Sequence, residues 1–422
     1  MNRQLAPLSS LPRHLSLNAI HKEKLANNLS LYVVEANTED LFQLNLVFKA
    51  GRYFESKRML AGLCANMILK GTKNKKAYEI AENFDFYGAA VKFEANMYSA
   101  QLSLYCLCSE LPKLLPLLIE VIEDANFPLN EIKKAKAKTK QKLAVQWKKN
   151  AYIANQEFNQ ILFGKDHAFG YLSNASYLEE ISQNDLLEHY KNYFSLKDDN
   201  FAIVAGSIGK AEIALLQKYL GSLSCTEGPG KLQSKISTSP AEEIRIEIPK
   251  ALQTAVRVGK ASLPIDHPDF ENLQILNTIL GGYFGSRLMS NIREEKGYTY
   301  GIYSFVNPIM DCSYFCISTE VGSQYKNQTL DEIEKEMNRL KEEPISEMEL
   351  SMVKNYMIGQ LMKSVDGPLN LSSTLKNFLI FDLEIEEINK QLEGIHKINA
   401  QELQELAQKH LNFNEMHKVL VG

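Results

Sequence analysis

Two stretches of the sequence, NFPLNEIKKAKAKTKQKL at residues 126–143 and EEPISEMELSMVKNYMIGQL at residues 342–361, follow the same pattern. Each has a proline, then a short polar residue beside an acid, Asn130 or Ser346, and then a long run suited to a helix. A proline ends the preceding helix, and a polar residue beside an acid is typical of a helix N-terminus. The shared pattern indicates that part of the chain is repeated.

A second pair of similar segments lies upstream in each copy. LCANMIL at residues 63–69 resembles QILNTIL at residues 274–280, and the offset between them is close to the offset between the two proline-containing stretches. The repeat fits a chain of 422 residues, which is too long for one ordinary core. We predict a first domain at residues 1–223, a linker rich in Ser, Gly and Pro at residues 224–242, and a second, homologous domain at residues 243–422.

The order of apolar patterns is the same in each copy: a strand, a helix, a pair of alternating strands and then two helices. In the first copy FQLNLVFKA precedes a helix around residues 60–69, AAVKFEANMYSAQLSLYC follows it, and LPKLLPLLIEVIEDA opens the helical part. Strands grouped beside grouped helices predict an α+β fold. We expect two tandem homologous α/β sandwich domains, each a mostly antiparallel sheet with helices packed on one face.

Charge and hydropathy exclude several classes of function. The 47 Lys and Arg residues and 51 Asp and Glu residues are interspersed and give a formal net charge of −4, which disfavours nucleic-acid binding. No stretch reaches the roughly 18 apolar residues of a membrane span, and the N-terminus lacks the apolar core of a signal peptide. We predict a cytoplasmic protein with neither a nucleic acid nor a membrane as partner, or a periplasmic one if a signal has been removed.

Several segments carry a resemblance to a known family. They are GRYFES at residues 51–56, KGTKNKKAYEIAENFDFYGA at 70–89, FAIVAGSIGKAEIALLQKYLGSL at 201–223 and LGGYFGSRLMSNIREEKGYTYGIYS at 280–304. Together with the tandem halves, they resemble the insulinase family of inverted zincins, which includes pitrilysin and the mitochondrial processing peptidase. The resemblance covers residues 26–422 and implies a function in the cleavage of peptides.

The resemblance also implies a zinc ion on a helix bearing His-x-x-Glu-His, where two histidines bind the metal and the glutamate is the general base. Aligned through the Lys-Gly-Thr that follows the motif, the ligand positions become Gly62 and Asn66, and the base becomes Ala65. The third ligand of the family, a glutamate, aligns to about Lys142, whose ammonium group would repel a divalent cation. The eight histidines form no cluster at ligand spacing. We therefore expect no zinc or other cofactor in this chain.

The most specific element of the resemblance is NIREEKGYTYGIYS at residues 291–304. The family has there an arginine and a tyrosine that reach the peptide substrate, and these fall on Arg293 and Tyr300. The resemblance implies that Arg293 binds substrate backbone carbonyls and that Tyr300 donates to the carbonyl oxygen on which negative charge develops. The pattern alone is more typical of an arginine on a solvated helix face and a tyrosine in a half-buried strand. Tyr298 is the competing phenol, because a strand's period of two gives it the same face as Tyr300.

The chain thus keeps the substrate-orienting residues of the family and lacks its metal ligands. In two-chain members, one subunit carries the zinc, and a homologous partner supplies the arginine and tyrosine across a closed chamber. The resemblance implies that this chain is the non-zinc subunit, inactive alone, whose partners are a homologous zinc-bearing subunit and a peptide substrate. The alternative is a scaffold without a role in proteolysis, of the kind that some respiratory complexes recruit from this family.

Overall fold

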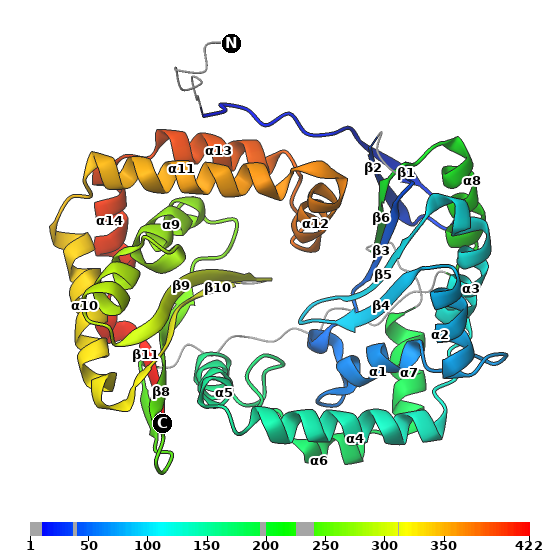
Figure 1. Cartoon of the computed structure of the whole chain (residues 1–422), viewed down its shortest axis with the longest axis horizontal. Coiled ribbons are helices and arrows are strands. Elements are labelled where there is room, and N and C mark those ends of the chain that lie inside the picture. The colour runs from blue at the N-terminus through cyan, green and yellow to red at the C-terminus, as the bar shows by residue number, and fades with distance from the viewer. Residues whose placement is uncertain (1–10, 37–39, 195–199, 225–239, 311) are drawn as a thin grey trace.

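The computed structural model describes residues 11–36, 40–194, 200–224, 240–310 and 312–422. Figure 1 shows two halves of similar architecture side by side, each with one β-sheet, and most of the helices cover the outer sides of the two sheets. The sheets are mostly antiparallel. This arrangement confirms the α+β fold with two tandem sandwich domains that the repeat predicts.

The first half contains a six-stranded sheet with the strand order β1-β2-β6-β3-β5-β4, in which only the β2–β6 pair is parallel among the described strands. Its strands are β1 (Ile20–Lys24), β2 (Ser30–Glu35), β3 (Phe42–Phe48), β4 (Ala90–Ala95), β5 (Ala100–Cys106) and β6 (Phe201–Gly206). Its helices are α1 (Leu60–Ile68), α2 (Ala77–Phe86), α3 (Leu111–Glu123), α4 (Leu129–Gln146), α5 (Asn150–Phe163), α6 (Ala175–Glu180), α7 (Gln183–Tyr193) and α8 (Lys210–Tyr219).

The second half contains a five-stranded sheet with the strand order β7-β11-β8-β10-β9, and here the β7–β11 pair is parallel. Its strands are β7 (Glu243–Ile246), β8 (Gln253–Ser262), β9 (Thr299–Ile309), β10 (Cys312–Gly322) and β11 (His417–Val421). Its helices are α9 (Phe270–Asn277), α10 (Lys326–Glu342), α11 (Glu347–Ser364), α12 (Gly367–Ile380), α13 (Glu387–Lys397) and α14 (Ala400–His410). The strand β9 therefore forms one edge of this sheet.

Each sheet is covered on its second face by one helix from the other half. In the first half, Leu46 of β3 packs into the core formed with that half's own helices, whereas Val47 packs on Leu371 and Leu375 of α12. The sheet of the second half is covered by α5, which comes from the first half. Phe158 of α5 packs in a cluster with residues of β8, β10 and β11. Alternate residues of a strand point to opposite faces, so these central strands are buried on both sides.

The sequence predictions for individual elements are mostly accurate. The helix expected around residues 60–69 is α1, and Ser346 caps α11 by accepting a hydrogen bond from the N–H of Glu349 at 3.2 Å. The expectation for Asn130 is wrong, because α4 already begins at Leu129, after Pro128. Proline lacks an N–H, and a helix start does not need one, so Pro128 can occupy that position.

The domain boundaries at residues 223 and 243 remain predictions. Most of the expected linker, residues 225–239, lies outside the described residues. The segment that precedes β1 contacts the second half, since Leu15 packs into its core and the Leu15 N–H donates to Asn389 Oδ1 at 2.8 Å. In the described part of the chain, every helix is too short or too polar to cross a lipid bilayer.

Candidate functional site

Arg293 and Tyr300 line the same open pocket at one end of the second half's sheet. The pocket has a volume of about 590 Å³. Its lining comes from the start of β8, the turn before β9, and the turn after β10: Leu252, Gln253, Arg293, Glu294, Gly297, Tyr298, Thr299, Tyr300, Gly322 and Tyr325. The sequence spacing of the two residues therefore corresponds to one shared surface.

A π-helical turn, η5 (Met289–Glu295), carries Arg293. Asn291 fixes this turn to α10, because its side-chain N–H₂ donates to Glu332 at 2.8 Å and to Glu336 at 2.7 Å. The chain then reverses at Gly297, whose φ of 66° lies in the left-handed region that glycine adopts without strain. Local π turns are frequent at functional sites.

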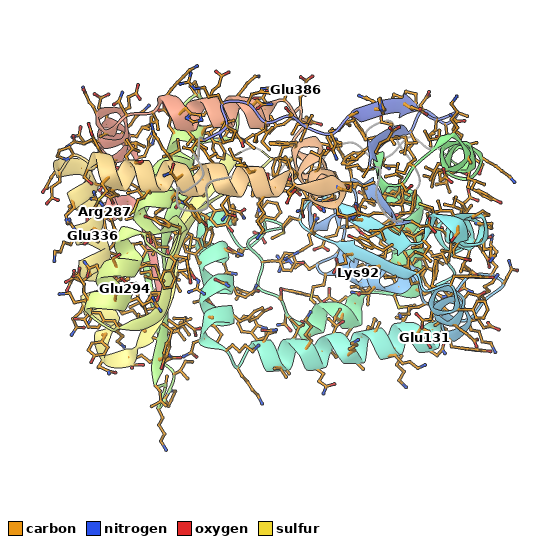
Figure 2. All side chains as sticks on the ribbon, turned by 45° about the horizontal axis from the view of Figure 1, so that its top comes forward. Lys92, Glu131, Arg287, Glu294, Glu336 and Glu386 are labelled. Carbon is orange, nitrogen blue, oxygen red and sulfur yellow. The ribbon has the colours of Figure 1, made fainter. Side chains whose placement is uncertain are left out.

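The segment that precedes η5 is also held in place. Arg287 makes two hydrogen bonds of 2.9 Å to the carboxylate of Glu349 on α11. This bidentate contact fixes the segment between α9 and η5. Figure 2 shows Arg287, Glu294 and Glu336 together in the second half, away from Lys92 on the edge strand β4 of the first half. Arg293 is thus mounted on a turn that is tied to two helices.

The guanidinium group of Arg293 lies over the ring of Phe284, with its Cζ atom 4.4 Å from the ring centroid. One of its Nη atoms is 3.5 Å from a carboxylate oxygen of Glu294, in a pair that is partly exposed. Such a pair contributes little to stability in water. The stacking orients the planar group and leaves most of its hydrogen-bond donors for a ligand.

A β-bulge places Tyr300 in solvent. Ile302 pairs with Thr319 but Thr299 pairs with Val321, so β9 has one more residue than β10 between these pairs. The hydroxyl of Thr299 holds the bulge, because it accepts from the Gly301 N–H at 3.0 Å and donates to the Glu320 carbonyl at 2.7 Å. A bulge redirects side chains and is frequent beside functional sites. Tyr300 is 92% exposed as a result.

Tyr298 and Tyr300 occupy different environments, which corrects the expectation that they share a strand face. β9 begins at Thr299, after Tyr298, and the bulge then interrupts the period of two. The ring of Tyr298 stacks on that of Tyr325, with centroids 4.4 Å apart and planes 12° from parallel, and packs against the core. Tyr298 therefore has a packing function, and Tyr300 is the phenol that faces solvent in this pocket.

The positions of the degenerate zinc motif lie on α1 in the other half. Gly62 and Asn66 are one turn apart, and the Asn66 side-chain N–H₂ donates to the Gly62 carbonyl at 2.8 Å. Ala65 is buried in the core. Lys142 is an exposed residue of α4, a helix that packs on α1. Gly62 and Asn66 thus lie on α1, Lys142 lies on a helix that packs on α1, and Ala65 points into the core, so the alignment of these positions with a zinc motif stays a prediction.

These four positions do not fit a zinc ion. Gly62 offers no ligand atom, Asn66 offers a weak amide oxygen, and Lys142 carries a positive charge. In the described part of the chain, no three His, Cys, Asp or Glu side chains gather in an arrangement that could hold a metal. The aligned positions on α1 and α4 therefore do not form a zinc site.

The start of α1 is nevertheless held as an ordered element. The carboxylate of Glu55 accepts hydrogen bonds from the N–H groups of Met59 and Ala61, both at 3.1 Å, and from the Tyr171 hydroxyl at 2.6 Å. Burial raises the pKa of Glu55, and the hydrogen bond from Tyr171 opposes this. A carboxylate at a helix N-terminus is favoured by the helix dipole. This cap was not predicted from the sequence, although Glu55 precedes the helix by only a few residues.

Three more features, all of the pocket that Arg293 and Tyr300 line, were not predicted from the sequence. Phe284 stacks on Arg293, Leu252 is 87% exposed at the rim, and the bulge at Gly301 turns Tyr300 outward. The glycine between two strand-like tyrosines was an available signal, since an isolated glycine in a strand pattern suggests a bulge. No comparable signal pointed to Leu252, because it comes from the start of a distant strand.

Two family models match the chain, and they meet within α6 of the first half, so they do not test the predicted domain boundaries. Residues 31–175 match the model described as insulinase, peptidase family M16, and residues 180–357 match the model described as peptidase M16 inactive domain. Together the two models cover more than half of the chain.

Among curated proteins, the chain is 27% identical over 337 residues to an uncharacterized zinc protease YmxG of Bacillus subtilis, covering 78% of this chain and 81% of that protein. It is 22% identical over 388 residues to a protein of Helicobacter pylori named non-peptidase homolog YmxG, covering 90% and 88%. Among solved structures, a peptidase M16 inactive domain from Pseudomonas fluorescens has a TM-score of 0.86 at 23% identity, covering 96% and 98% of the two chains. At that identity, the structural match shows the fold alone.

Proposed function

Since the chain belongs to the insulinase family of peptidases, M16, as an inactive homologue, we propose that it is the non-zinc subunit of a two-chain zinc peptidase. In this proposal a homologous chain supplies the zinc, and this chain supplies Arg293 and Tyr300. The observation that carries the proposal is the position of Tyr300, which is 92% exposed beside Arg293 in one pocket.

A scaffold without a ligand would gain nothing from this arrangement. Exposing a tyrosine ring forgoes the free energy of its burial, and a bulge interrupts the ladder of hydrogen bonds between β9 and β10. A bulge beside an exposed aromatic ring is typical of binding sites. Hydrogen bonds from Asn291 and Arg287 likewise hold the turn that carries Arg293. The guanidinium group of Arg293 itself takes no part in these bonds.

The two side chains have distinct tasks in this proposal. Arg293 binds backbone carbonyl groups of the peptide, because its planar group offers several donors in a fixed geometry. Tyr300 donates its O–H to the carbonyl oxygen of the scissile bond, on which negative charge develops in the transition state. A donor placed in advance stabilises that charge more than the neutral ground state, and it therefore lowers the barrier. The zinc chemistry belongs to the partner chain.

Reconstitution tests the proposal. This chain is mixed with a homologous chain that bears an intact His-x-x-Glu-His motif, and complex formation is followed by size-exclusion chromatography and analytical ultracentrifugation. Hydrolysis of a fluorogenic peptide library should need both chains, while each chain alone stays inactive. If a complex forms and peptide hydrolysis by the zinc-bearing chain is unaffected by this chain, the scaffold function is correct instead.

A further inference from the structure

A second pocket of the second half lies between α9, α11 and α13, three helices that pack on one another (Figure 1). It has a volume of about 400 Å³. A pocket of this size is typical of sites for small molecules. Its walls include Glu271 and Ile275 of α9, Met357 and Leu361 of α11, and Gln391 and Ile395 of α13. The two residues of each pair are four positions apart, so one face of each helix borders the pocket.

The walls of this pocket are mostly apolar. Phe270, Ile275 and Ile395 are buried residues of the second half's core, and Leu361 packs against that core. The ring of Tyr356 adds an aromatic wall and is itself held by the ring of Tyr283, with the two centroids 5.0 Å apart. Such walls suit the hydrocarbon part of a ligand, whose removal from water favours binding.

Glu271 is the one charged residue among the described residues that line the pocket. It is partly buried, and in the described part of the chain its carboxylate forms no ion pair or hydrogen bond. Burial raises the pKa of Glu271, and the nearby carboxylate of Glu387 raises it further, while Lys390 opposes this. Lys390 is already paired with Glu387. A partly buried carboxylate without a partner is unfavourable, so a cation beside Glu271 would be stabilised.

The carboxylate of Glu271 is accessible because the facing residue of α13 is a glycine. A Cβ atom at Gly394 would lie 3.5 Å from Glu271 Oε2, so a larger side chain there would cover the carboxylate. Glycine is unfavourable inside a helix, and at this position it leaves space beside the charge. Gln360 and Gln391 also line the pocket, and their side-chain amides form no hydrogen bond within the described residues. Their carbonyl oxygens can accept from a ligand's N–H groups.

We propose that this pocket binds a small organic cation, namely an ammonium group carried on an apolar body. The ammonium group donates to Glu271 and to the amide oxygens of Gln360 and Gln391, and the apolar body lies between the three helices. The single negative charge among apolar walls selects a cation over a neutral or anionic molecule of the same shape. Among the described residues, the pocket shares no lining residue with that of Arg293 and Tyr300, so the proposal does not depend on them.

The experiment uses the full chain and three probes with the same hydrocarbon part: phenylbutylamine, phenylbutanol and phenylbutanoate. At neutral pH these are a cation, a neutral molecule and an anion, and isothermal titration calorimetry measures the affinity of each. We expect the amine to bind at least about tenfold more tightly than the alcohol, because hydrogen bonds between charged groups are stronger than those of a hydroxyl. The carboxylate should bind most weakly, since it meets the charge of Glu271.

The test variant is Glu271→Gln, which removes the charge and keeps nearly the same shape. It should lower the affinity for the amine about tenfold and change the affinity for the alcohol by less than about twofold. The matched control is Glu386→Gln, which removes the same charge from an exposed residue that precedes α13 and lies outside the pocket (Figure 2). This control should bind all three probes as the unsubstituted chain does. Gly394→Leu adds a side chain beside Glu271 and should weaken the binding of both the amine and the alcohol.

Four outcomes would overturn the proposal. The first is equal affinity of the amine and the carboxylate, and the second is unchanged affinity for the amine in Glu271→Gln. The third is an equal loss of amine binding in Glu386→Gln, which would show a general effect of charge. The fourth is tighter binding of an end-blocked Gly-Lys-Gly peptide than of the amine, which would show that the pocket receives a lysine side chain of a polypeptide instead.

Discussion

Arg257 of β8 and Asn155 of α5 join the two halves of the chain, because the Arg257 Nε–H donates to Asn155 Oδ1 at 2.6 Å. Asn45 of β3 and Ser372 of α12 form the corresponding contact on the other side, at 3.4 Å. Each polar pair thus lies where a helix of one half crosses the central strand of the other half's sheet. The reciprocal contacts fix how the two sheets are placed, and therefore where α1 lies relative to β9.

Removing the amide of Asn155 should destabilise the whole chain. Arg257 is buried, so Asn155→Ala leaves one of its N–H groups without a partner, which costs about 2 kcal/mol. Ser372→Ala removes a longer bond between neutral groups, and we expect a cost of about 1 kcal/mol or less. Unfolding in urea measures both variants. Equal effects of the two substitutions would show that Arg257 does not depend on Asn155.

The sequence predicted the fold of each half because the repeat and the strand–helix order are local patterns. It could not predict that α5 and α12 cover the opposite half's sheet, since this contact joins residues far apart in the chain. The candidate site likewise has one feature that is visible in the local sequence and one that is not. The spacing of Arg293 and Tyr300 was visible, whereas the bulge that separates Tyr300 from Tyr298 depends on the register between β9 and β10.

Restoring the two histidines of the metal motif in α1 should not suffice to bind zinc. The combination of Gly62→His and Asn66→His supplies two ligands, and a side chain at position 62 has open space around its Cβ. Ala65 is left unchanged, because it is buried in the core and a glutamate there would bury an unpaired charge. Lys142 still opposes the ion, so the double variant should retain less than stoichiometric zinc after dialysis. Adding Lys142→Glu should raise zinc retention, as measured by plasma mass spectrometry. One tightly held zinc in the double variant would show that the third ligand is elsewhere.

Acid should weaken the ion pair between Lys57, in the segment before α1, and Asp185 of α7. Partial burial of Asp185 would raise its pKa, but hydrogen bonds from Lys57 and from Ser182 outweigh this and lower the pKa to about 2. Because this pKa lies below the ordinary value, the charged form stabilises the fold above about pH 4, and this contribution is lost as the pH falls from about 4 to 2. Asp185→Asn should therefore lower the denaturation midpoint at pH 7 and have little effect at pH 2. An equal effect at both pH values would contradict this linkage.

Arg293→Ala should weaken substrate capture in a reconstituted pair. The loss of donors to peptide carbonyls affects the bound ground state as well as the transition state, so KM should rise more than kcat falls. Phe284→Leu serves as a control for orientation, because it removes the ring beneath the guanidinium and retains the charge. This control should raise KM less than Arg293→Ala does. If Arg293→Ala leaves KM unchanged in an active pair, Arg293 does not bind the peptide.

The hydroxyl of Tyr300 provides the most direct test of the proposed function. Tyr300→Phe removes one O–H from an exposed ring and should leave folding and assembly intact, while kcat of the reconstituted pair falls about 10²–10³-fold. Tyr298→Phe is the matched control, since it preserves the stack on Tyr325 and should leave kcat within about twofold of the unsubstituted pair. Full activity of the Tyr300→Phe pair, with the two chains assembled, would contradict the proposal that this chain stabilises the transition state in its partner's active site.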